Sequence, residues 1–118
     1  MSINREDFGV TFDVNVGTSK ELELTVIDPD TGVAKDLSDT NVYATGIVQI
    51  LKPDLTQIGA NITIFFDTPR TTGIVTFTVT NTSHTLAANA GNWIGKVIFK
   101  NVSNQVIDQQ KFNLNILE

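Results

Sequence analysis

The stretch GNWIGKVIFK (Gly91–Lys100) decides the fold class, because it has the pattern of one strand with apolar residues on both faces. Successive side chains of a β-strand point to opposite faces of a sheet, so a strand with one wet face alternates apolar and polar residues. One face carries the set expected of a core: Trp93, Gly95, Val97 and Phe99. Ile94 and Ile98 share the other face with two lysines. The stretch therefore predicts a strand whose outer face is partly apolar.

Six other short runs are rich in Val, Ile, Thr and Phe, and turn residues separate them, which is typical of an all-β domain. DPDTG at residues 28–32 and the Lys52-Pro53-Asp54 sequence place Pro and Gly where turns need them. The predicted strands cover residues 8–16, 20–27, 42–51, 58–66, 75–80, 91–100 and 105–117. Seven short antiparallel strands in a single domain, residues 1–118, predict an all-β, two-sheet immunoglobulin-like sandwich, with a small barrel as the alternative.

Composition excludes several classes of protein. Hydrophobic residues make up 41% of the chain, enough for a core without metals or disulfides, and cysteine is missing. The net charge of -5 repels a phosphate backbone, so nucleic-acid binding is not expected. The N-terminal sequence lacks the apolar region of a signal peptide, and no run approaches the roughly 18 apolar residues that cross a bilayer. We expect a soluble protein made in the cytoplasm, with no membrane partner.

Residues that carry catalysis are scarce, since the chain has one histidine. His84 lies in a predicted loop, and its sequence neighbours do not make a triad, whose members converge from separate elements. The acidic residues that could suggest a Ca²⁺ site lie in predicted turns: Asp28, Asp30, Asp36 and Asp39. Their spacing matches no complete calcium loop, and Asp is an ordinary turn residue. We therefore expect a protein that is not an enzyme, with no cofactor and no metal, and with His84 as a solvated loop residue.

A sugar-binding sandwich usually needs an exposed aromatic platform, and the chain has one Trp and one Tyr. Trp93 lies in the inward register of its strand and is expected in the core. Tyr43 lies in the outward register of the run at 42–51, which makes it the possible glycan contact. The sequence therefore leaves a carbohydrate-binding module open as an alternative function.

The off-pattern isoleucines combine with a second strand into a predicted surface. In an immunoglobulin-like sandwich the third and sixth strands are neighbours in one sheet. Val48 and Ile50 take the inward register of the third strand, which sends Ile47 and Leu51 outward. The predicted apolar patch on the outer face of this sheet consists of Ile47, Leu51, Ile94 and Ile98.

Full burial of four such side chains is worth roughly 6–12 kcal/mol before the costs of association, so the patch predicts a protein interface. Two alternatives remain. The four side chains can be singly exposed residues of a monomer, or the connection at residues 28–41 can fold over this face.

Several stretches, by their order and spacing, resemble the N-terminal domain of baseplate upper proteins of tailed bacteriophages. VGTSKELELTVIDPDTG (residues 16–32) looks like the first hairpin of that family, and VQILKPD (residues 48–54) resembles its strand that ends in a Lys-Pro-Asp turn. Asp36-Leu37 before Val42 resembles the family's entry to its next strand, and AGNWIGKVIFK (residues 90–100) resembles its strand that opens with Ala-Gly and an aromatic residue. The resemblance covers most of the chain and implies an immunoglobulin-like module of a phage virion.

Two features depart from the family pattern. Leu55 stands where the family usually has a turn glycine, and we expect no stalk or receptor-binding segment after Glu118. A freestanding copy fits a tail or baseplate adaptor, or a capsid decoration (cement) protein.

We therefore predict a noncatalytic structural protein of a tailed-phage virion, made in the host cytoplasm. Its predicted partners are other virion proteins of the capsid, tail or baseplate, which it meets as a homo-oligomer or in many copies. The main alternative is a carbohydrate-binding module that aids attachment to the host surface through Tyr43. A small hydrolase using His84 is a further alternative.

Overall fold

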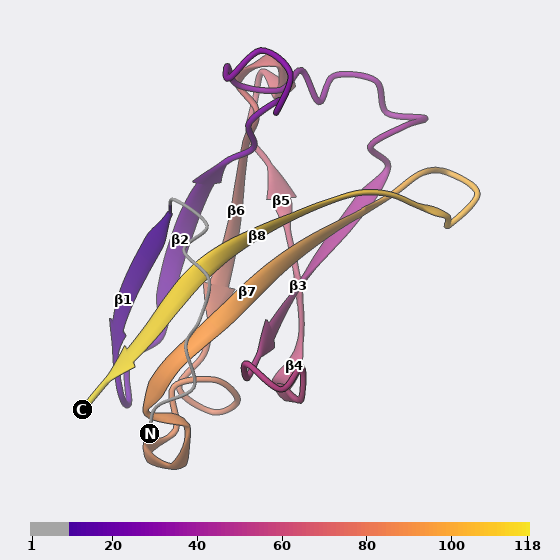
Figure 1. The fold of residues 1–118 in the computed structure, drawn as a ribbon. Coiled ribbons are helices and arrows are strands. Elements are labelled where there is room, and N and C mark those ends of the chain that lie inside the picture. The colour runs from indigo at the N-terminus through magenta and orange to yellow at the C-terminus, as the bar shows by residue number, and fades with distance from the viewer. Residues whose placement is uncertain (1–9) are drawn as a thin grey trace.

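A computed structural model describes residues 10–118 as two packed β-sheets (Figure 1). The five-stranded sheet has the order β1-β8-β7-β3-β4 and the three-stranded sheet has the order β2-β6-β5. Two short 3-10 helices, η1 (Arg70–Thr72) and η2 (Ala87–Asn89), lie in the connections. The strands are β1 (Thr11–Asn15), β2 (Lys20–Thr25), β3 (Thr45–Leu51), β4 (Gln57–Thr63), β5 (Phe65–Phe66), β6 (Ile74–Val79), β7 (Gly91–Lys100) and β8 (Val106–Leu117). The first two residues of the predicted strand 8–16 lie outside the described residues.

The predicted immunoglobulin-like sandwich is confirmed by the way the strands are distributed between the sheets. β3, β7 and β8 are neighbours in one sheet, and β2 and β6 pair in the other, as in immunoglobulin domains. All strand pairs are antiparallel except β1 with β8, which are parallel. The first strand forms one edge of the five-stranded sheet, and the last strand lies beside it.

The predicted strand at 58–66 is corrected to two strands that belong to different sheets. Thr63 of β4 pairs with Ile47 of β3, whereas Phe65 of β5 pairs with Thr76 of β6. The chain crosses at Ile64, which is buried and whose N–H donates to the Gly46 carbonyl at 3.2 Å. Apolar alternation continues through the crossing because Ile64 still faces the core, so the sequence pattern does not reveal the change of sheet.

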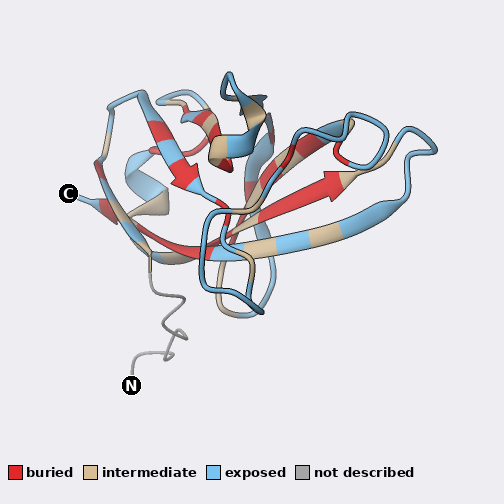
Figure 2. Ribbon diagram, turned by 90° about the horizontal axis from the view of Figure 1, so that it is seen from above, coloured by how far each residue is buried: buried red, intermediate tan, exposed pale blue. Residues whose placement is uncertain are grey.

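Aromatic rings form the centre of the core. Phe112 of β8 lies 5.4 Å from Phe12 and 5.3 Å from Phe77 between ring centroids, which joins the two sheets. The neighbouring strand makes room for this ring with Gly95, which is paired with Phe112. Figure 2 shows the resulting alternation of buried and exposed residues along the strands. The inward registers predicted for Val97 and Phe99 are confirmed by their complete burial.

Candidate interaction surface

The structure brings the four predicted interface residues together on the outer face of the five-stranded sheet. β3 and β7 are adjacent and antiparallel, and their register pairs Ile47 with Ile98 and Leu51 with Ile94. Paired residues of an antiparallel ladder point to the same face, with Cβ atoms about 4.5–5.5 Å apart. The four residues, which we call the outer patch, therefore lie as two directly opposed pairs on one face.

The outer patch exposes less surface than the sequence predicts. Leu51, Ile94 and Ile98 are only 7%, 9% and 8% exposed. Ile47 is half-buried. The Gln49–Lys96 pair lies between the two apolar pairs, and long polar side chains can lay their aliphatic stems along apolar neighbours. A partner on this face would bury little additional apolar area, and the interface role of the patch stays a prediction.

Lysines give the outer face a positive character. Lys96 and Lys100 alternate with Ile94 and Ile98 along β7. Lys111 of β8 lies directly opposite Lys96 in the strand register, on the same face of the sheet. Within residues 10–118, neither Lys96 nor Lys100 forms an ion pair. These lysines share the face of the isoleucines in the sequence pattern as well, but alternation alone assigns them no role.

The three-stranded sheet presents the opposite charge on its outer face. Glu21 and Glu23 of β2 alternate with the buried residues Leu22 and Leu24, so both carboxylates point away from the core. Among the described residues, lysines of β7 and β8 therefore lie on the outer face of one sheet and glutamates of β2 lie on the outer face of the other. Such segregation favours partners of defined charge, because complementary potentials guide association and exclude partners of like charge.

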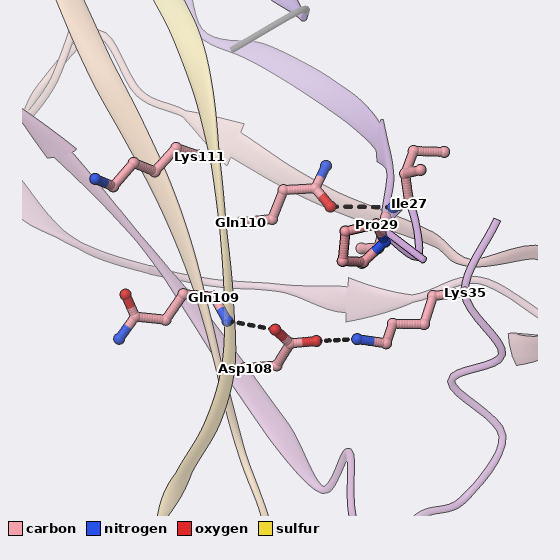
Figure 3. Close-up of a pocket in the computed structure, with 8 residues that line it drawn as sticks. Ile27, Pro29, Lys35, Asp108, Gln109, Gln110 and Lys111 are labelled. Atoms are coloured by element: carbon pink, nitrogen blue, oxygen red, sulfur yellow. Dashed lines mark hydrogen bonds and ion pairs between the residues drawn. The ribbon is translucent and has the colours of Figure 1, made fainter. Parts of the chain in front are cut away.

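A hollow of about 460 Å³ lies between β8 and the connection that follows β2 (Figure 3). Gln110 of β8 donates to the Thr25 carbonyl at 3.2 Å and accepts from the Ile27 N–H at 3.0 Å. The Gln110 side chain therefore hydrogen-bonds to backbone groups at the edge of β2, which has no neighbouring strand on this side in its sheet. Because Gln110 is already engaged in these backbone hydrogen bonds, we assign this side chain a structural role rather than a ligand-binding one.

An ion pair fixes the same connection to β8. Lys35 pairs with Asp108, and this hydrogen bond raises the pKa of the Lys35 ammonium. Asp108 is paired with Phe99, whose side chain is in the core, so the connection is attached on the inner side of β8. These contacts do not place the connection at residues 28–41 over the outer patch.

The predicted outward orientation of Tyr43 is wrong. Tyr43 is 9% exposed and belongs to the core, with its ring 5.5 Å from that of Phe99 in an edge-on contact. β3 begins only at Thr45, and the N–H of Tyr43 donates to the Asp39 carbonyl at 2.8 Å in the preceding turn. The turn breaks the two-residue period, so counting back from the strand assigns the wrong face. Tyr43 therefore offers no flat ring to a sugar.

His84 is buried, which corrects the expectation of a solvated loop residue. It is 3% exposed, and its imidazole joins two segments. Nε2 lies 2.9 Å from the Ala60 carbonyl, and Nδ1 lies 3.2 Å from the Thr80 N–H. A backbone N–H can only donate, so Nδ1 is the acceptor and Nε2 carries the proton. Both ring nitrogens are thereby engaged in structural hydrogen bonds.

The acidic residues of the predicted turns cap their own turns. Asp28 accepts the N–H of Asp30 at 2.9 Å, and Asp36 accepts that of Ser38 at 2.9 Å. The hydrogen bonds from Ser38 lower the pKa of the exposed Asp36 carboxyl. Residues 10–118 contain no group of three or more His, Cys, Asp or Glu side chains placed to hold a metal ion.

Comparisons with protein-family models, curated proteins and solved structures found no match for the chain. The short helical turns of the described chain lack the length and apolar character needed to cross a bilayer.

Proposed function

We propose that the chain is a noncatalytic assembly module whose five-stranded sheet docks through its outer face on a neighbouring protein. The supporting observation is the register of β3 and β7, which gathers Ile47, Leu51, Ile94 and Ile98 into two opposed pairs beside Lys96. Sheet faces that combine an apolar centre with charged neighbours resemble the core and rim of protein interfaces.

Charge selects the partner more than apolar area does in this proposal. Three of the four patch residues are already less than a tenth exposed, so the remaining apolar gain is small. Lys96 and Lys100 lack ionic partners among the described residues, and an acidic surface would supply them. Complementary charge raises association rates and fixes orientation. The neighbouring protein therefore presents carboxylates opposite β7.

The setting we propose is the virion of a tailed bacteriophage. The sequence resemblance to the N-terminal domain of baseplate upper proteins supports this setting, and the immunoglobulin-like sandwich is compatible with it. In this role the chain is a tail or baseplate adaptor or a capsid decoration protein, present in several copies and bound to other virion subunits. The carbohydrate-binding alternative loses Tyr43 as its contact residue, since that ring is in the core.

A charge reversal at the centre of the face tests the proposal. Lys96→Glu places a carboxylate between Ile94 and Ile98, whereas Lys20→Glu makes the same charge change at the start of β2 in the other sheet. Each variant replaces the wild-type chain during assembly of the phage that encodes it, and the chain in purified particles is counted by mass spectrometry. We expect Lys96→Glu to lower incorporation about tenfold or more, because reversing an interfacial charge adds repulsion, and Lys20→Glu to incorporate normally.

Thermal unfolding of both purified variants controls for folding. Wild-type incorporation of a folded Lys96→Glu variant would contradict docking through this face. Equal loss for both variants would show that net charge, and not the outer face of the five-stranded sheet, governs assembly.

A further inference from the structure

A second hollow lies where the chain crosses from the five-stranded to the three-stranded sheet. Its volume is about 400 Å³, within the range of roughly 300–1,000 Å³ typical of small-molecule sites. β4 pairs with β3 only as far as the Thr63–Ile47 pair, so the start of β3 has no β4 residue beside it. The residues that line the hollow include Thr45, Thr63, Phe65, Thr68 and Arg70.

Arg70 holds a fixed position in this hollow. Its guanidinium carbon lies 4.0 Å from the centroid of the Phe66 ring, and Nη1 donates to the Tyr43 carbonyl at 2.8 Å. Its backbone carbonyl accepts the Leu37 N–H at 3.2 Å. The side chain is therefore held by stacking and by a hydrogen bond before any ligand arrives, which reduces the entropy lost on binding.

The charge of Arg70 has no carboxylate partner among the described residues, where Lys35 and Asp108 form the one ion pair. A guanidinium presents five N–H donors in a planar fork that matches a carboxylate. One donor bonds to the Tyr43 carbonyl, so the fork retains donors for a second acceptor. Arg70 thus offers a pre-positioned cation at a hollow of ligand size.

The other lining groups suit the ring of a sugar. Phe65 is 67% exposed, so the ring offers a flat apolar surface to the C–H face of a pyranose. Thr45, Thr63 and Thr68 are exposed and carry hydroxyls that can both donate and accept. A small number of polar groups around an apolar platform is the usual composition of a small-molecule site.

We propose that this hollow binds a carboxylate-bearing saccharide, with a uronic acid placing its carboxylate on Arg70 and its ring on Phe65. The site shares no residue with the outer patch, although its Thr63 pairs with Ile47 of that patch. It uses the Tyr43 carbonyl to hold Arg70 but not the Tyr43 ring. It supplies a glycan contact that the sequence placed on a different residue. The inference is independent of the proposed docking function, since neither site contains residues of the other.

An NMR titration of the ¹⁵N-labelled chain tests the site with digalacturonate and, as the neutral probe, the galactose disaccharide of the same linkage. We expect digalacturonate to produce saturable shifts in the amides of Thr45, Thr63 and Thr68, and the neutral disaccharide to bind about ten- to hundredfold more weakly because it lacks the charge-assisted contact. Arg70→Gln should weaken digalacturonate binding by a similar factor. Lys20→Gln removes the same charge from the other sheet and should leave binding unchanged.

Phe65→Ala is a second variant that can be used if Arg70→Gln destabilises the fold. The Phe65 ring is mostly exposed, so its removal leaves the core intact. We expect this variant to lose about tenfold in digalacturonate affinity. Three results would overturn the proposal: no saturable shifts with digalacturonate, equal binding of both disaccharides, or unchanged binding by both Phe65→Ala and folded Arg70→Gln. Arg70-dependent binding of a short polyglutamate peptide that is tighter than that of digalacturonate would assign the site to acidic peptides instead.

Discussion

Replacement of His84 by alanine tests whether this histidine is structural. The imidazole bridges β4 and the loop after β6, with Nε2 2.9 Å from the Ala60 carbonyl and Nδ1 3.2 Å from the Thr80 N–H. Removal of the ring leaves both backbone groups without these partners and opens a cavity beside Gly59, where an added Cβ would lie 2.6 Å from His84 Cδ2. The variant therefore loses two hydrogen bonds and the packing around them.

The expected loss of stability follows from these two hydrogen bonds. A buried polar group left without a partner costs about 1–3 kcal/mol. Ala60 is exposed, so water can partly replace the histidine there, whereas Thr80 is half-buried. We expect His84→Ala to lower the free energy of unfolding by about 2–3 kcal/mol, toward the lower end of the summed range. With a urea m-value of about 1–3 kcal/mol/M, this loss lowers the urea midpoint by about 0.7–3 M.

Urea unfolding followed by tryptophan fluorescence measures this loss, because Trp93 packs against the core and is the single tryptophan. His84→Gln supplies one donor and one acceptor and should recover part of the stability. Ser83→Ala removes the 2.9 Å bond from the Ala60 N–H and should cost only about 0.5–1.5 kcal/mol. If His84→Ala lowers the free energy of unfolding by less than about 0.5 kcal/mol, the structural role is refuted, since ordinary surface substitutions fall in that range.

Two further predictions concern the core and the ion pair. Gly95→Ala should lower the free energy of unfolding by about 1–3 kcal/mol, because the new Cβ would lie 2.0 Å from Phe112 Cζ, in a ring that is packed on both sides. Urea unfolding measures this loss, which should be smaller when Phe112 is also replaced by Leu. An unchanged loss in the Phe112→Leu background would contradict the steric cause. The Lys35 pKa is raised above 10.5 by the Asp108 hydrogen bond, so its contribution is complete below pH 10.5 and is lost as the pH rises through the folded-state pKa. The stability difference between wild type and Asp108→Asn should accordingly shrink above pH 10.5, and a pH-independent difference would contradict this linkage.

Part of the candidate docking face was predictable from the sequence. The broken alternation at Ile94 and Ile98, together with the neighbouring third and sixth strands of the fold class, predicted which side chains share the outer face, and the observed register places them in pairs. Their low exposure was not predictable, because alternation does not record how other side chains pack over a face. Alternation specifies a face but not how much of that face remains open to a partner.

The pocket around Arg70 had no sequence signal. Arg70 lies in a polar connection between two strands, and its ring partner, Phe66, belongs to a strand that the apolar pattern joined to β4. The pocket exists because the chain changes sheets at Ile64. That change depends on strand pairing between distant segments, which a local pattern does not record.

By itself, the sequence predicted an all-β sandwich, most of its strands and inward residues such as Val97 and Phe99, because the two-residue period indicates which side chains leave water. Only the tertiary structure decided the crossing at Ile64, the inward turn of Tyr43 and the partners of His84, whose acceptor at Ala60 is 24 residues away. The physical reason is that burial is encoded locally by alternation, whereas hydrogen-bond partners and hollows arise from segments that meet only when the two sheets pack.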